Sequence, residues 1–210
     1  GWGMITNWGA HHMDIVQWGL GTEDRGPLEV SGVCGWLTDG LWNAHAEFDL
    51  LYKYEGGIDV SVCNKYPNGV RFIGDDGWIF VSRGSTKVTA SDPTMPGTTL
   101  KALDASDPKL LAGALGPDAV RLHVSNDHVQ DWLLAIRSRA SAVTNAEIGH
   151  RFTSVCTLGH MCMKTGKSLK WDYRAEKTDN AEANKLLPCM ERGGFSIAKA
   201  LAAAGIKVKV

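Results

Sequence analysis

The residues best suited to chemistry stand close together near the start of the chain. Asn7, His11 and Asp14 recur at spacings of four and three residues, which places them on one face of an α-helix. A histidine, with an ordinary pKa of about 6.5, is the side chain best able to exchange a proton at neutral pH. The spacing makes His11 a candidate acid–base group. A structural histidine in a capping network is the competing interpretation.

A metal site is the second chemistry to consider, because histidines and cysteines gather at two places. His12 lies about 100° around a helix from His11, so these adjacent imidazoles lack the i, i+4 geometry of a zinc-binding pair. Cys156 and His160 do have that spacing, with Cys162 close by, but no fourth ligand accompanies them. We expect core thiols and a structural histidine there, and no metal.

No phosphate-binding turn is evident in the sequence. Gly1-Trp2-Gly3 lacks the third glycine of a dinucleotide fingerprint, and Gly19-Leu20-Gly21 follows a predicted helix rather than a strand. A P-loop and a nucleophile elbow are also missing. We therefore expect no nucleotide cofactor to be bound by this chain itself.

The candidate residues need a helix to carry them and a sheet to support it. Capping patterns predict a helix over residues 6–18, with Thr6 as its N-cap and with Gly19 and Gly21 ending it. Alternation over residues 43–55 predicts a half-buried antiparallel strand. The apolar face of this strand carries Ala44, Ala46, Phe48, Leu50, Tyr52 and Tyr54. Its polar face carries His45, Glu47, Asp49, Lys53 and Glu55.

The rest of the chain alternates between strand and helix patterns. Hairpin turns are predicted at Gly56-Gly57 and Asp75-Asp76-Gly77. Residues 91–118 hold four of the seven prolines and are predicted to form a loop, a candidate lid or arm. The other predicted elements are strands at 28–34, 58–65, 70–73, 78–82, 169–171 and 206–210, and helices at 126–139, 144–164 and 180–187.

Composition is that of an ordinary globular domain and narrows the possible partners. The chain has 210 residues with 22 basic and 23 acidic side chains, a net charge of −1 without a basic block. This balance argues against a nucleic-acid or membrane partner, and no apolar run approaches the ~20 residues that span a bilayer. The five cysteines form no CxxC pair, which favours reduced thiols and a cytoplasmic location.

Several blocks of the sequence resemble one enzyme family. The block GMITNWGAHHMDIVQWGLG (3–21) resembles the substrate-side catalytic helix of the Gfo/Idh/MocA oxidoreductases, which are nicotinamide-dependent enzymes acting mostly on sugars, inositols and related polyols. The resemblance continues, in order, through YPNGVRFIGDDGWIFVSRG (66–84), HVQDWLLAIRSR (128–139), AEIGHRFTSVCTLGHM (146–161) and LKWDYRAEKTDNAEAN (169–184). The last stretch, 196–210, resembles nothing in that family.

This resemblance implies a fold and a domain plan. The fold would be α+β, with a large, mostly antiparallel open sheet and helices packed on one face. Residues 1–210 would form one C-terminal-type domain for substrate binding and oligomerisation, truncated at its N-terminal side. The N-terminal Rossmann domain, which holds NAD or NADP in the family, and the family's Glu-Lys-Pro motif are absent from these residues.

The same resemblance implies roles for individual residues. The family's Asp-x-Gly-x-His motif corresponds to Asn7, Gly9 and His11, so His11 would be the acid–base group and Asn7 its orienting neighbour. Asn7 departs from the pattern because an amide cannot stabilise an imidazolium by charge. The implied substrate-binding residues are His12, Asp14 and Trp18.

The implied reaction is hydride transfer from a secondary alcohol of a sugar, inositol or related polyol, in a homo-oligomer associated through its sheet. Two alternatives stay open. One is a non-catalytic binding or assembly module, and the other is half of a nicotinamide-dependent glycosidase of the same family. We expect this chain alone to be inactive, because it has no cradle for the cofactor.

Overall fold

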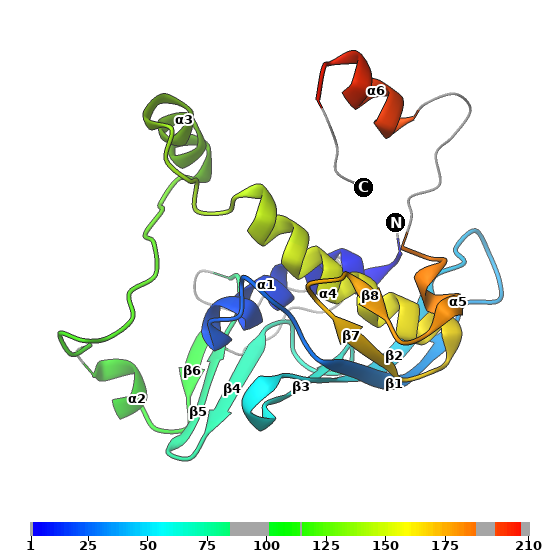
Figure 1. The fold of residues 1–210 in the computed structure, drawn as a ribbon. Helices are drawn as coiled ribbons and strands as arrows, with labels where there is room; N and C mark the ends of the chain where they lie inside the picture. Colours follow the sequence, from blue (N-terminus) through cyan, green and yellow to red (C-terminus); the bar gives the residue numbers. More distant parts are fainter. Residues whose placement is uncertain (1, 85–100, 114, 188–195, 207–210) are drawn as a thin grey trace.

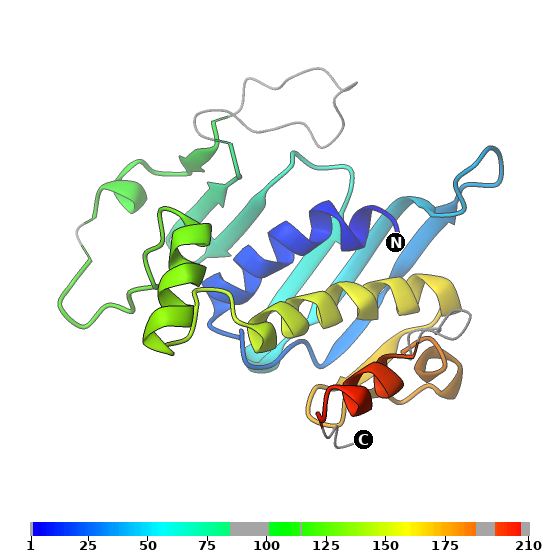
Figure 2. The same cartoon turned by 90° about the horizontal axis from the view of Figure 1, so that it is seen from above.

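Two helices, α1 (Trp8–Leu20) and α4 (Ala146–Thr165), lie side by side on one face of an antiparallel sheet (Figure 1, Figure 2). The fold is that of a computed structural model, which describes residues 2–84, 101–113, 115–187 and 196–206. The predicted α+β class, the antiparallel pairing and the placement of helices on one face are confirmed.

The strands form two hydrogen-bonded sheets with antiparallel neighbours. The larger sheet has five strands in the order β3-β2-β1-β7-β8, and the smaller has three in the order β4-β5-β6. Helix α1 bridges the sheets, because Phe72 of β4 packs against Gly19 of the helix. The strands are β1 (Glu29–Trp36), β2 (His45–Lys53), β3 (Asp59–Cys63), β4 (Val70–Gly74), β5 (Gly77–Val81), β6 (Leu103–Ala105), β7 (Leu169–Asp172) and β8 (Lys177–Thr178).

Local sequence signals account for the hairpins and for helix α4. A 3₁₀ turn, η2 (Glu55–Gly57), joins β2 to β3, and β4 pairs with β5 across a tight turn, so both predicted hairpins are confirmed. The side chain of Asn145 caps α4 by accepting a hydrogen bond from the backbone N–H of Ile148, and Gly166 ends it in the left-handed conformation. The remaining helices are η1 (Met4–Thr6), α2 (Lys109–Ala112), α3 (His128–Ser138), α5 (Ala181–Asn184) and α6 (Ile197–Ala203).

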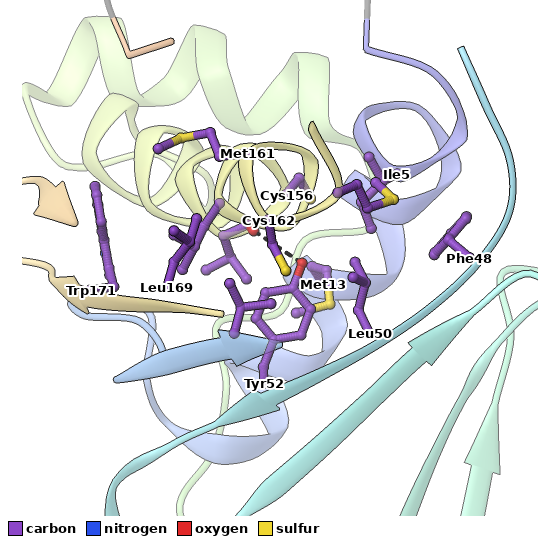
Figure 3. Packing of buried hydrophobic residues seen from close by; sticks show 14 of the residues in the cluster. Ile5, Met13, Phe48, Leu50, Tyr52, Cys156, Met161, Cys162, Leu169 and Trp171 are labelled. Carbon is purple, nitrogen blue, oxygen red and sulfur yellow. Dashed lines mark hydrogen bonds between the residues drawn. The ribbon is translucent and has the colours of Figure 1, made fainter. Parts of the chain in front are cut away.

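The hydrophobic core lies between the two long helices and the five-stranded sheet (Figure 3). Leu50 and Tyr52 of β2 have no exposed surface, and Cys156 and Cys162 of α4 cover them from above. The hydroxyl of Tyr52 donates a hydrogen bond to the backbone carbonyl of Val155 at 3.3 Å. This bond satisfies the one polar group that the tyrosine brings into the core and ties α4 to the sheet.

A buried polar network fixes the C-terminal end of α1 to β2. The Tyr54 hydroxyl donates to Gln17 Oε1 at 2.9 Å, and the same oxygen accepts from the Thr22 hydroxyl at 2.8 Å. Gln17 Nε2 in turn donates to the backbone carbonyls of Thr22 and Arg25. Because every polar atom of the buried Gln17 amide is satisfied, α1 is held in one orientation over the sheet.

Helix α1 begins and ends two residues later than its capping pattern predicts. Thr6 belongs to the 3₁₀ turn η1, where its hydroxyl donates to Gly3 O and accepts from the backbone N–H of Trp2, so it is not the N-cap. Asn7 takes the cap position, without a capping bond from its side chain. Gly19 stays inside the helix, and Gly21 ends it in the left-handed conformation.

Strand β2 departs from strict alternation at its start, and this moves one histidine. Between the pairs Cys34–Phe48 and Trp36–His45, β2 has one more residue than β1, which makes a β-bulge. The bulge turns His45 from the predicted polar face into the core, where it is 5% exposed. The side chain of Asn64 holds the bulge through the Phe48 N–H and the Ala46 carbonyl, at 3.1 and 3.0 Å.

Two predicted segments fall partly outside the described residues. In residues 101–113 of the predicted loop, strand β6 adds to β5 and helix α2 follows, so this part is not a loop, whereas residues 115–118 hold no helix or strand, as predicted. The cause is a tertiary ladder, in which the backbone N–H of Ser82 also donates to Ala102 O at 2.7 Å. Residues 91–100 and 114 lie outside the description, as do residues 207–210 of the predicted final strand.

Candidate functional site

His11 stands on the outer surface of α1, away from the core. Its side chain is exposed, and so is that of Asn7 at the helix cap. Asp14 and Trp18 follow on the same side of the helix by their spacing, and both are half-buried. Among the described residues, no hydrogen bond joins Asn7, His11 and Asp14, so the helix places them along one face without forming a triad.

Trp8 brings together groups that the sequence pattern leaves apart. The indole ring lies edge-on to the His11 imidazole, with ring centres 5.9 Å apart, and it lies 6.0 Å from the ring of His12. The guanidinium of Arg83, in the segment after β5, lies 6.0 Å from the centre of the same indole. His12 is therefore half-buried beside Trp8, whereas His11 is exposed.

Sequence reasoning missed both Trp8 and Arg83 as site residues. A signal for Trp8 was present, because it precedes His11 and His12 by three and four residues and must share their side of a helix. No local signal could identify Arg83, because only the tertiary packing of α1 on the small sheet brings the two segments together.

Burial and charge hold both imidazoles in the neutral form. Burial, and then the positive charge of Arg83, lower the pKa of His11. The pKa of His12 is lowered to about 4 by burial first, and then by the charges of His11 and Arg83. Burial and the carboxylate of Glu23 raise the pKa of Asp14. At pH 7 the exposed imidazole of His11 is therefore neutral and able to accept a proton.

Several buried polar atoms of α1 have no hydrogen-bond partner among the described residues. They are His12 Nε2, Asp14 Oδ1 and Trp18 Nε1. These three atoms belong to the residues for which the family resemblance implies substrate binding. Four atoms outside α1 also lack a hydrogen-bond partner in the described structure, namely Arg25 Nε, His45 Nδ1, Ser125 Oγ and His160 Nδ1, so this feature does not by itself mark α1 as a binding surface.

A second histidine cluster, formed by His45 and His160 with Trp2 and Trp36, lies outside the predicted site. The ring of Trp2 stacks on His160 of α4 at 4.6 Å, and Trp36 lies edge-on to both His160 and His45, at 6.2 and 6.5 Å. The ammonium of Lys164 lies 4.8 Å above the Trp36 ring. The β2 bulge creates this cluster by turning His45 inward. In the described part of the chain, no three His, Cys, Asp or Glu side chains are grouped to hold a metal ion.

The fold should lose stability as the pH falls from 6.5 to 4. Burial is the main cause that lowers the pKa of His12 and of His160 to about 4 from an ordinary value of 6.5. Between these values the unfolded chain binds protons that the folded chain does not, so the free energy of unfolding decreases with decreasing pH. We expect calorimetry to show a falling unfolding midpoint over this range, with a shallower fall in His160→Phe. An unchanged midpoint would contradict the neutral, buried state of these rings.

Cys156 and Cys162, the cysteines considered above as metal ligands, lie in the core. The described cysteines, Cys34, Cys63, Cys156 and Cys162, are free. Burial raises the pKa of Cys156 to about 12 and that of Cys162 to about 11, so both stay as thiols at neutral pH. Thiols in this state are poor nucleophiles and poor metal ligands.

Helix α3 and the following loop frame a hollow that is separate from His11. Its lining includes Trp132 and Ile136 of α3 and Asn145 at the start of α4. The apolar side chains of α3 are largely exposed, with Trp132 57% accessible. In the described residues, no helix has the length and apolar character that a membrane span requires.

Comparison with known proteins gives similarity at the level of structure only. The scan against family models and the search of curated proteins give no match. Among solved structures, the chain is similar to the crystal structure of an NAD-binding protein from Listeria innocua, with a TM-score of 0.46 and 13% sequence identity. The similarity covers 80% of this chain and 51% of the other, so the chain spans about half of that protein. A similarity of this size establishes neither a family nor an activity.

Proposed function

We propose that this chain is the substrate-binding half of a nicotinamide-dependent oxidoreductase that acts on a secondary alcohol of a sugar, inositol or related polyol. The observation that carries the proposal is the exposed, neutral imidazole of His11, set beside Trp8 on a helix that the sheet holds rigidly. The five ordered blocks that resemble the Gfo/Idh/MocA oxidoreductases support the same assignment.

The chemistry of the site suits recognition and deprotonation of an alcohol. His11 can take the hydroxyl proton of the substrate, since its lowered pKa keeps it unprotonated at neutral pH. The Trp8 ring offers an apolar face of the kind on which sugar rings pack. Asp14 and Trp18 each keep a buried polar atom without a partner in the described structure, and we propose that these side chains shape the wall of the site beside His11.

The described residues do not fit a bound dinucleotide. The described strand pairs are antiparallel, whereas a dinucleotide fold places the pyrophosphate between a parallel strand and the glycine-rich start of a helix. Our proposal therefore gives this chain the substrate and the proton only. The nicotinamide, which accepts hydride in such enzymes, would be held by another domain or subunit.

The proposal predicts that polyols bind at His11. We expect D-glucitol or myo-inositol to shift the NMR signals of the His11 imidazole and the Trp8 indole in a saturable way. 1,6-Hexanediol, which lacks secondary hydroxyls, should leave them unchanged, and His150 of α4, hydrogen-bonded to Glu176, serves as the internal reference.

Two outcomes would contradict this assignment. Polyols that move His150 as much as His11, or move neither, would favour the alternative of a non-catalytic assembly module. Micromolar binding of NAD⁺ to this chain in calorimetry would contradict the assignment of the cofactor to another domain or subunit.

We further propose that copies of this chain associate through the sheet face opposite α1. No helix among the described residues covers that face (Figure 1). Val33 of β1 and Ile73 of β4 project from it and are 72% and 80% exposed. Apolar side chains this accessible on a strand face are typical of a protein interface.

Negative charge introduced on this face should dissociate the oligomer. We expect sedimentation to show an oligomer for the unaltered protein and a smaller species for the double variant Val33→Glu/Ile73→Glu. Val120→Glu adds a charge of the same sign at an 88% exposed site outside both sheets and should leave the oligomer intact. A monomer at high concentration before any substitution would contradict the proposal.

A further inference from the structure

Arg83 places a permanent positive charge beside the candidate proton acceptor. Its side chain is exposed, and its guanidinium lies 6.0 Å from the Trp8 ring that also contacts His11 and His12. The residue follows β5, on the side of the small sheet that α1 covers. Arginine, indole and imidazole therefore meet at one exposed surface.

No acidic group among the described residues neutralises this charge. Arg25 and Arg151 both form ion pairs with carboxylates, at 3.2 and 2.6 Å, whereas Arg83 has no carboxylate within 4.0 Å in the described structure. The pKa of Asp14, on the same helix as His11, is raised by burial and then by the carboxylate of Glu23. Among the described residues, no hydrogen bond occupies the five donors of this guanidinium.

The charge of Arg83 reaches both imidazoles. After burial, the charge of Arg83 is the second cause that lowers the pKa of His11, and no carboxylate among the described residues raises this pKa. The same charge contributes to the lowered pKa of His12. A neutral ligand would leave this positive field without a partner, whereas an anion at Arg83 would offset it.

From this arrangement we infer that the substrate is an acidic polyol, whose carboxylate or phosphate group pairs with Arg83 while a hydroxyl group faces His11. This inference rests on the proposed function and names the substrate class for the same site. Guanidinium pairs with the two oxygens of a carboxylate or phosphate through parallel hydrogen bonds, which fixes orientation as well as position. Because the hydroxyl groups of a polyol are chemically similar, pairing with Arg83 would determine which of them faces the His11 imidazole.

The test compares three probes of similar size that differ in charge. They are D-glucitol, which is neutral, D-gluconate, which carries a carboxylate, and D-glucitol 6-phosphate, which carries a phosphate. We expect at least one anion to bind about ten- to a hundredfold more tightly than D-glucitol, the range for a charge-assisted hydrogen-bonded pair. The tighter of the two anions identifies the acidic group, and NMR of His11 and Trp8 reports the binding site.

Two arginine variants separate the site from bulk charge. Arg83→Gln should abolish the difference between the affinity for the anion and the affinity for D-glucitol. Arg71→Gln is the matched control, because Arg71 stacks on Trp78 at 4.6 Å on the strand face away from α1, and it should change neither. Circular dichroism confirms that each variant is folded.

The outcomes distinguish this inference from the proposed function. If D-glucitol binds at His11 and neither anion binds more tightly, the inference is wrong and the proposed function stands. The inference is also wrong if the preference survives in Arg83→Gln or disappears equally in Arg71→Gln. If none of the three probes affects His11, both the inference and the proposed function are wrong.

Discussion

Replacing Gly159 with alanine should destabilise the fold, whereas the same replacement at Gly149 of the same helix should stabilise it. A Cβ atom at position 159 would overlap the Tyr52 hydroxyl and lie 3.0 Å from Leu50 Cδ1, and both side chains are fully buried. At position 149 a Cβ meets nothing within 4 Å. Because alanine is favoured over glycine in helices by about 1 kcal/mol, only the packing of α4 on β2 can reverse the sign.

The expected sizes follow from the contacts. Overpacking a core costs about 1–3 kcal/mol, and displacing Tyr52 also costs its hydrogen bond to the Val155 carbonyl. We expect chemical denaturation to show a loss of about 2 kcal/mol for Gly159→Ala and a gain of about 0.5–1 kcal/mol for Gly149→Ala.

A double-mutant cycle identifies the cause. Tyr52→Phe removes the hydroxyl that the new methyl group would overlap, so Gly159→Ala should cost less in that background. Equal costs in both backgrounds, or equal effects at positions 149 and 159, would mean that α4 does not pack on β2 through Gly159.

The parts of the fold that sequence predicts are those set by local contacts. Asn145 and Gly166 mark the ends of α4 because capping involves only the nearest residues. Alternation correctly predicts that Phe48, Leu50 and Tyr52 face the core, because a strand side chain changes face at every step.

The errors occur where distant residues override local signals. Asn64 of the loop after β3 holds the β2 bulge, so the inward position of His45 depends on a residue nineteen positions away in the chain. Thr6 has an N-cap sequence, but its hydroxyl is used by Gly3 and Trp2. Likewise, the hairpin before Arg83 could be predicted, but its packing against α1, which brings Arg83 to Trp8, could not. The helix and His11 could be predicted, but the charge beside them could not.

Substituting His11 by glutamine should reduce oxidation of the polyol about 10²–10⁴-fold in the protein supplied with its cofactor-binding partner, the range for losing a general base. The substrate loses its proton acceptor but keeps its other contacts, so kcat should fall far more than KM rises. In the unaltered protein, the rate of oxidation should rise with pH through the lowered pKa of His11, because only the neutral ring accepts a proton.

His12→Gln is the control that separates proton transfer from shape. His12 lies on the same helix and beside the same indole, but its pKa of about 4 keeps it neutral over the whole range of the assay. Its replacement can change substrate binding, yet it should leave the pH dependence of kcat in place. His11→Gln should abolish that dependence. If His11→Gln keeps both its rate and the rise with pH, the proton acceptor is another group, and α1 only positions the substrate.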